Sequence, residues 1–268
     1  MERKVPRIEG RAVFDKIYFP VVSICASFLV GGAVFALLGF DPAAAFGGLL
    51  SGSLGSVGAW GETLNKAVPV ALTGLSYAVA QRCGGVNLGA EGQVYIGALC
   101  GVLVGTELNL PGPRHILAVL AASFLGGAVF GAIPAMMKNR FGASELITTI
   151  MLNYVALYFV HYMIAGPIKD MDATSNYAQS KQMLETAQLP RLIPGTRLHA
   201  GLIVAIAALL FYQFFLFHTT RGYELRVIGL NRTAGECAGM NAKRNTLISM
   251  FLAGGFAGLG GACELMGV

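Results

Sequence analysis

The sequence predicts an all-α protein, a polytopic transmembrane helical bundle. Of its 268 residues 55% are hydrophobic and only 12% are charged, and the mean hydropathy is +0.64. A soluble domain carries about 25% charged residues. The apolar residues also come in long runs almost free of charge, and about 20 such residues cross a bilayer as a helix. We expect about seven spans within residues 17–268, after a cytoplasmic tail over residues 1–16.

The first apolar run, residues 17–40, is too long for a signal peptide and ends at Asp41. Residues 43–65 are rich in Gly, Ser and Ala and suit an interfacial segment better than a span. The second span, residues 66–81, is short and contains Pro69, so we expect a kinked or discontinuous helix.

Five further apolar runs follow along the chain. They predict spans over residues 94–108, 116–137, 146–165, 199–217 and from 246 onward. Residues 166–198 are polar and form the longest loop, and residues 219–245 form a second, charged segment.

The distribution of basic residues predicts the topology. With the amino terminus in the cytoplasm and successive spans alternating, about 13 of the 19 Lys and Arg residues fall on the cytoplasmic side and about five outside. Residues 166–198 then form an extracytoplasmic loop, and residues 219–245 lie in the cytoplasm. The net charge of +5 is thus explained by topology, and no nucleic-acid partner is expected.

Sequence signatures of catalysis are absent. There is no Gly-x-x-x-x-Gly-Lys-Ser/Thr phosphate loop and no His-Glu-x-x-His or Gly-x-Ser-x-Gly motif. The five cysteines have neither metal-ligand spacing nor a disulfide pattern. The sequence therefore predicts no enzyme, no metal and no cofactor on this chain.

Polar residues next to glycines mark a candidate transport pathway. Asn87, Glu91 and Gln93 lie in a Gly-punctuated stretch between apolar runs, where an ionisable group is costly unless it faces protein or a water-filled cavity. We expect Glu91 in a protein interior. The alternative is that Glu91 and Asn87 cap helices and bond internally.

The start of the fifth span supplies two more pathway candidates. Thr149 and Asn153 are four residues apart and so share one helix face. A threonine in a membrane helix often bonds to its own backbone, which is the structural alternative for Thr149. Asn153, in mid-helix, is the more suggestive residue.

The charged segment 219–245 contains a weak helix. Asn231 can cap a short helix that ends at Gly239, with Glu236 inside it, and Thr233 is an alternative start at capping-box spacing from Glu236. So short a helix is unstable alone in water and needs a partner surface, either on this chain itself or on another protein. The alternative is a plain solvated loop.

Several motifs resemble one permease family. They are Gly-Gly-Val-Asn-Leu-Gly-Ala-Glu-Gly-Gln over residues 84–93, Phe-Gly-Ala-Ser-Glu-Leu-Ile-Thr-Thr-Ile-Met-Leu-Asn-Tyr over 141–154, Gly-Pro-Ile-Lys-Asp over 166–170, and residues 226–240. The chain after Pro69 resembles the branched-chain-amino-acid and simple-sugar type of ATP-binding-cassette importer permease, most closely its nucleoside-uptake branch.

The resemblance implies partners and roles. The charged segment is similar to the family's docking segment for the ATP-binding subunit, which would make Gly222, Arg226, Gly229, Asn231 and Glu236 the coupling residues. ATP and Mg would then bind the partner ATPase. A second permease subunit, an extracytoplasmic solute-binding lipoprotein and membrane lipid are the other expected partners, and a prokaryotic plasma membrane is the expected location.

Two departures from the family pattern lead to further expectations. Gly235 stands where the family usually has alanine, which weakens the docking helix by up to about 1 kcal/mol. The chain stops at Val268 inside an apolar run, so a C-terminal truncation is expected.

Two functions remain open from the residues alone. The first is an importer permease for nucleosides or related simple sugars. The alternative is a secondary transporter or channel for a small polar solute, which would need more buried ionisable residues than Glu91 and no docking segment. Composition and spacing do not separate nucleoside, ribose, other sugar or amino acid as the substrate.

Overall fold

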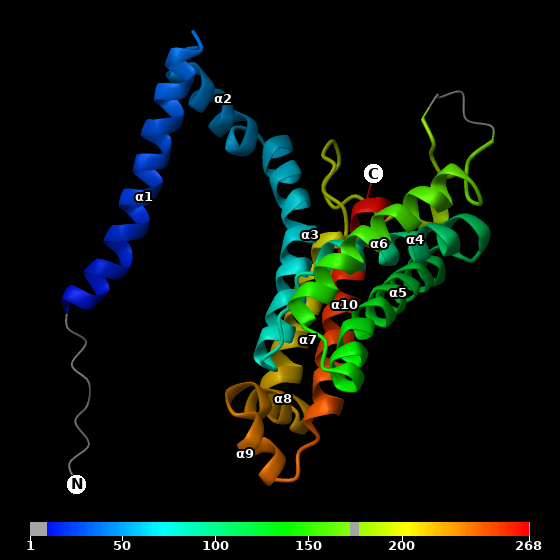
Figure 1. Cartoon of the computed structure of the whole chain (residues 1–268). Coiled ribbons are helices and arrows are strands. Elements are labelled where there is room, and N and C mark those ends of the chain that lie inside the picture. Colours follow the sequence, from blue (N-terminus) through cyan, green and yellow to red (C-terminus); the bar gives the residue numbers. More distant parts are fainter. Residues whose placement is uncertain (1–9, 172–176, 268) are drawn as a thin grey trace. The chain divides into compact units, whose positions relative to one another are not determined.

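The computed structural model describes residues 10–171 and 177–267, with side chains described from Tyr18 onward. In this part of the chain the regular structure is helical, apart from isolated β-bridges between Lys169 and Ser180 and between Arg191 and His199. The chain divides into two units, residues 1–60 and residues 61–268. Figure 1 traces the helices in chain order.

The first unit contains α1 (Gly10–Leu37) and α2 (Pro42–Leu54). The Asp41 carboxylate caps α2 by accepting from the Ala43 amide at 2.9 Å, and a proline follows at the first helical position. Phe46 of α2 packs edge-on against Phe28 and Phe35 of α1. At 13 residues α2 is too short to cross a bilayer as a helix, while residues 57–65 of the predicted interfacial segment belong to the next helix.

The expected discontinuity in the second span is wrong. Residues 57–82 form one continuous helix, α3 (Val57–Arg82), with Pro69 inside it. A proline removes one backbone hydrogen bond from a helix, and here the rest of the helix continues past it. The break falls after α3 instead, in residues 83–89.

Three helices form the centre of the second unit: α4 (Ala90–Glu107), α5 (Gly112–Phe141) and α10 (Ala242–Met266). Their backbones approach at glycines: a Cβ added to Gly127 would meet the Gly254 carbonyl oxygen, and one added to Gly97 would meet the Gly258 Cα. Small residues four apart thus mediate helix packing, as expected where lipid gives helices no hydrophobic reason to associate.

The outer helices of this unit are α6 (Glu145–Ala165) and α7 (Gly201–His218). Only 11% of the apolar window of α6 is buried, against 72% for α10. Most of α6 therefore faces lipid or another protein chain.

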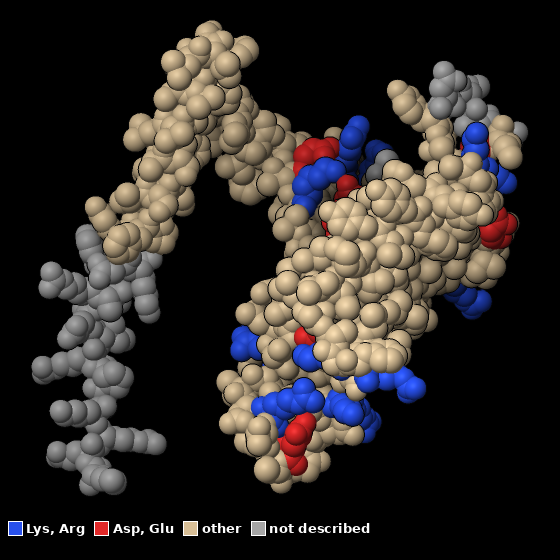
Figure 2. Space-filling view, viewed as in Figure 1, with Lys and Arg blue, Asp and Glu red and all other residues tan. Residues whose placement is uncertain are grey.

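Five helices are long and apolar enough to cross a membrane, judged by length and composition over the described residues: α1, α5, α6, α7 and α10. In Figure 2, Lys, Arg, Asp and Glu side chains gather toward two ends of the second unit, with a nearly uncharged surface between them. The chain is a multi-pass membrane protein.

The segment between α6 and α7 contains one short 3₁₀ helix, η1 (Glu185–Ala187). It lies on the helix ends, since the Leu189 amide donates to Met266 at 2.8 Å and the Leu184 amide donates to Gly105 at 3.1 Å. His115 is fully buried beneath it and bonds Thr186 at 2.8 Å.

Candidate functional site

The chain reverses direction between α3 and α4 through residues 83–89. Gly84 adopts a left-handed conformation (φ 77°), and the Gly85 amide donates to the Ala80 carbonyl at 3.0 Å. This irregular backbone lies between apolar helices, so its polar groups need partners within the protein.

A buried cluster of polar side chains supplies some of these hydrogen-bond partners. The Asn87 amide nitrogen donates to Gln93 Oε1 at 2.9 Å and to Ser76 Oγ at 3.0 Å, and Gln93 Nε2 donates to Asn87 Oδ1 at 3.0 Å. Asn87 Oδ1 also accepts from the Gly89 amide at 3.0 Å. Asn87 and Gln93 therefore fasten α3 to α4, with their polar groups directed at each other.

Helix α6 forms hydrogen bonds to the backbone on either side of the start of α4. Asn153 Oδ1 accepts from the Gly92 amide and its Nδ2 donates to the Leu88 carbonyl, both at 2.9 Å. Thr149 is fully buried and donates to the Glu145 carbonyl at 2.7 Å. The contacts of Asn87 and Thr149 thus match the structural alternatives given for these two residues, and Gln93 and Asn153 also bond within this chain.

Glu91, which was expected in a protein interior, is not buried within this single chain. It lies in the first turn of α4, and its side chain is exposed on the surface of this chain rather than buried within it. The Tyr95 hydroxyl, one turn further on, donates to it at 3.5 Å. The reason is helical geometry: Gln93 points toward α3, so Glu91, two residues earlier, points away from it.

A mostly apolar cavity of about 270 Å³ lies between α4, α6 and the segment that follows α6. Tyr95, His161 and Ser180 are its polar lining residues. Sequence reasoning missed this cavity, because its walls come from segments up to 170 positions apart, Tyr95 and Leu265 being the extremes.

Sequence reasoning also missed a buried ion pair at the α5–α6 turn. The Glu145 carboxylate, whose side chain is 7% exposed, lies 3.0 Å from Lys138 Nζ. Glu145 is also the first residue of α6. A lysine and a glutamate flanking the Gly142 turn were the available signal.

The charged segment forms α8 (Thr220–Leu230) and α9 (Arg232–Cys237). The predicted cap is confirmed: Asn231 Oδ1 accepts from the Ala234 amide at 3.1 Å. Helix α9 ends two residues before Gly239, which is left-handed (φ 81°). Glu236 is exposed and pairs with Arg232 at 3.1 Å.

Two glycines fix α8 against the membrane helices. A Cβ on Gly222 would meet the Phe215 carbonyl oxygen of α7, and one on Gly229 would meet the Arg82 carbonyl oxygen at the end of α3. Gly235 is also buried, and an alanine there would place its Cβ 3.1 Å from Ile228. Glycine at position 235 therefore relieves crowding, beyond any loss of helix propensity.

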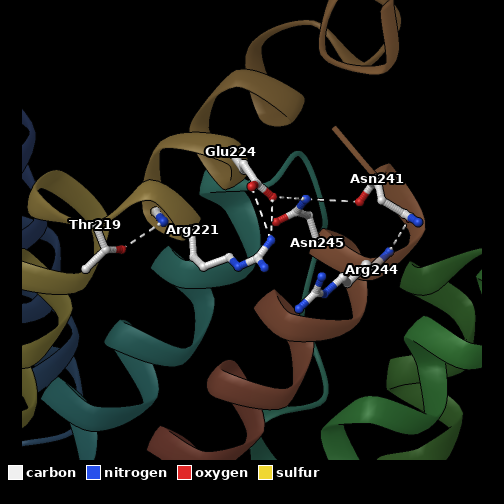
Figure 3. A network of polar contacts seen from close by, with 7 residues as sticks. Thr219, Arg221, Glu224, Asn241, Arg244 and Asn245 are labelled. Atoms are coloured by element: carbon white, nitrogen blue, oxygen red, sulfur yellow. Dashed lines mark hydrogen bonds and ion pairs between the residues drawn. The ribbon is translucent and has the colours of Figure 1, made fainter. Parts of the chain in front are cut away.

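A polar network joins α8 to α10 (Figure 3). The Glu224 carboxylate accepts from Asn245 Nδ2 at 3.0 Å and from Arg221 at 3.1 Å. The hydrogen bond from Asn245, with a smaller contribution from Arg221, lowers the pKa of Glu224 below its usual value. The network holds α8 rigidly on the transmembrane helix that forms the centre of the bundle.

Of the sequence-predicted residues, the structure brings Asn87, Glu91, Gln93, Thr149 and Asn153 together around one break. Gly222, Arg226 and Gly229 lie on the inner side of α8, while Asn231, between α8 and α9, and Glu236 of α9 are exposed. In the described residues no cluster of His, Cys, Asp and Glu could hold a metal ion.

Comparison with known proteins decides the class. Residues 60–268 match the profile of the family described as branched-chain amino acid transport system / permease component. The chain belongs to this permease family. It is a permease subunit of an ATP-binding-cassette importer, which excludes the secondary-transporter alternative and an enzymatic role, because ATP hydrolysis in such importers resides in another subunit.

Curated relatives agree with this assignment. The permease is 34% identical to the guanosine ABC transporter permease protein NupP of Bacillus subtilis, over 92% of this chain and 71% of the relative. It is 35% identical to the nucleoside ABC transporter permease protein NupB of Lactococcus lactis, over 92% and 70%. A glucose ABC transporter permease protein of Haloferax volcanii is 34% identical over 92% and 67%. No solved structure matches the permease.

Proposed function

We propose that this permease imports nucleosides, with related simple sugars as the second candidate. The similarity to NupP and NupB over 92% of the chain carries the proposal. The 34% identity to the glucose permease supports simple sugars as the second candidate.

The aromatic character of the α4–α6 face favours a nucleoside. Tyr95 and His161 line the cavity beside this face, and Tyr154, Tyr158 and Tyr162 follow at one-turn spacing on the exposed surface of α6. Aromatic side chains stack on nucleobases, which a hexose lacks. We propose that the solute moves along this face, past Glu91, Asn153 and Tyr95, and that a second permease subunit completes the route.

The amide cluster has a supporting role in this proposal. Asn87 and Gln93 hold the irregular backbone that places Glu91 at the start of α4, and Thr149 packs against that backbone at Gly89. In this proposal these side chains position the backbone beside the pathway and do not contact the solute.

The proposed topology has seven crossings, with α3 and α4 joining the five apolar helices. Residues 17–268 then form the transmembrane domain and residues 1–16 the cytoplasmic tail. Both added helices are long enough, at 26 and 18 residues. The excess of Lys and Arg on the side of α8 and α9 supports a cytoplasmic amino terminus.

The proposed partners follow from the topology and the family. The exposed end of α8 and α9, with Asn231 and Glu236, would dock on the ATP-binding subunit, which holds ATP and Mg. The segment 166–198 would face an extracytoplasmic solute-binding lipoprotein. Because α8 is tied to α10 through Glu224, movement of the ATPase would reach the centre of the bundle.

The substrate is tested by uptake. Membrane vesicles containing the permease with its ATPase and binding protein should accumulate labelled guanosine, and unlabelled nucleosides should compete at far lower concentration than ribose or glucose. Preferential competition by a sugar would overturn the nucleoside assignment.

The docking surface is tested by charge reversal at its exposed end. Glu236→Arg should reduce co-purification of the ATPase and substrate-stimulated ATP hydrolysis, because it breaks the pair with Arg232 and reverses a surface charge. Arg191→Glu, at an exposed residue of the 166–198 segment, is the matched control and should leave co-purification of the ATPase unchanged. Normal coupling in Glu236→Arg would contradict the docking role.

A further inference from the structure

A cavity of about 520 Å³ lies between α3, α7 and α8. Ala78, Gln81 and Arg82 of α3, Tyr212 and Phe217 of α7, and Arg226, Gly229 and Leu230 of α8 line it. The proposed pathway lies along α4 and α6, so this cavity needs a separate explanation.

Two arginines from different helices line this cavity without anionic partners. In the described part of the chain neither Arg82 nor Arg226 forms an ion pair with a carboxylate. The Arg226 guanidinium stacks over the Phe217 ring, 4.9 Å from its centroid, and its Nε is buried with no hydrogen-bond partner among the described residues. A buried donor left without a partner is unfavourable, and more so when charged.

The position of Arg226 bears on the sequence prediction for it. Its side chain stacks on Phe217 of α7 and lines this cavity, whereas Asn231 and Glu236 are at the exposed end of the segment. Direct contact of Arg226 with the ATPase is therefore less well supported than contact by α9.

The other walls of the cavity indicate a lipid. Tyr212 lies six residues inside α7, and Ala78 lies four residues before the end of α3, so the cavity extends from the charged helix ends toward the apolar part of the bundle. Phe217 and Leu230 expose large apolar side chains beside it. A molecule with an anionic head and an apolar tail fits both parts.

We infer that this cavity binds the phosphodiester headgroup of an anionic membrane lipid, with Arg82 and Arg226 on the phosphate and an acyl chain along α3 and α7. Basic pockets between transmembrane helices on the cytoplasmic side bind such headgroups, and each basic residue near an anionic membrane surface contributes about fivefold in affinity. Arginine's fork of donors matches phosphate oxygens. The site is independent of which solute the permease carries.

The test measures lipid retained by the purified importer complex after extraction from vesicles of equal phosphatidylglycerol and phosphatidylcholine. Native mass spectrometry should show phosphatidylglycerol enriched on the wild type. Arg82→Gln and Arg226→Gln should each lower the enrichment about fivefold, and the double variant should lose it. Arg226→Lys should keep part of it, since charge remains while the fork is lost.

The matched control is Arg140→Gln. Arg140 also stacks on a phenylalanine at a helix end, 5.9 Å from the Phe141 ring centroid, but lines no cavity described above. It should retain full enrichment. Equal loss in Arg140→Gln, retention in the double variant, or displacement of phosphatidylglycerol by millimolar inorganic phosphate would overturn the inference. Loss of the lipid whenever the ATPase is bound would instead assign the cavity to an acidic segment of that protein.

Discussion

At the scale of single residues, Glu91 and Gln93 show how neighbours on one turn take different roles. Gln93 is 1% exposed and bonds Asn87, while Glu91 is exposed and forms a long contact of 3.5 Å with the Tyr95 hydroxyl. A carboxylate facing lipid is costly, which supports the proposal that Glu91 faces a second subunit or the aqueous solute path.

Glu91→Gln should reduce uptake by about tenfold, because a charged hydrogen bond to the solute or to the facing subunit contributes about 1.5–3 kcal/mol. The amount of permease in the membrane should not change, since the side chain packs on nothing buried in this chain. Glu107→Gln, at the exposed far end of the same helix, is the control and should transport normally. A parallel fall in folded protein and uptake would show that Glu91 is structural.

Sequence reasoning located the residues around the α3–α4 break but could not assign their contacts. The buried partners of Asn87 are Ser76 and Gln93, and those of Asn153 are backbone groups more than 60 residues away. The sequence shows that a membrane segment contains an asparagine or glutamine. It does not show whether the side-chain amide contacts a solute or the backbone of an interrupted helix. Only the fold distinguishes the two.

At the scale of helices, glycine contacts determine how closely α5 and α10 pack. Gly258→Leu should prevent assembly of the bundle, because its Cβ would overlap the Ser123 carbonyl oxygen, and backbone cannot yield as a side chain can. The loss should exceed the about 1–3 kcal/mol typical of overpacking. Gly74→Leu is the control, since a Cβ there meets nothing within 4 Å. Fluorescence-detected size-exclusion of both variants measures the folded yield, and equal yields would contradict this packing role.

The Glu224 network predicts a pH dependence for the attachment of α8 to α10. The folded-state pKa of Glu224 is lowered, so its contribution to stability is fully present above its unfolded pKa of about 4.3 and is lost as the pH falls toward the folded value. At pH 7, Glu224→Gln should lower the melting temperature by about 2–4 °C, the equivalent of about 1 kcal/mol. The difference from wild type should shrink below about pH 4.5. A difference that stays constant down to pH 3.5 would show that ionisation of Glu224 does not matter.

Helix boundaries were predictable where apolar runs end at glycine, proline or charge. The predicted span 146–165 and the observed α6 differ by one residue at the start. The prediction was poorest for α3, because Glu62, Lys66 and Pro69 interrupt the apolar pattern without interrupting the helix. Lys66 instead reaches Glu264 of α10 at 2.9 Å, a partner 198 residues away that no local pattern reveals.

At the scale of the whole molecule, composition was sufficient for the class of protein and insufficient for its internal arrangement. The all-helical membrane bundle follows from apolar run length. The central position of α10 does not, since its mean hydropathy of 1.5 is below the 2.0 of the more exposed α7. Glycines, which lower hydropathy, are what allow α10 to occupy the centre.

The proposed topology predicts which exposed residues an impermeant reagent reaches from outside the cell. In a variant lacking the five native cysteines, Gln182→Cys and Thr233→Cys each place one thiol at an exposed position, the first in the segment between α6 and α7 and the second on α9. In the proposed topology of seven crossings, the basic residues near α8 and α9 lie in the cytoplasm and residue 182 lies outside. An impermeant maleimide should therefore label Gln182→Cys in intact cells and Thr233→Cys only after permeabilisation. The two sites are separated by α7 alone, so labelling of both from the same side would mean that α7 does not cross, and the reverse pattern would mean that the whole bundle is inverted.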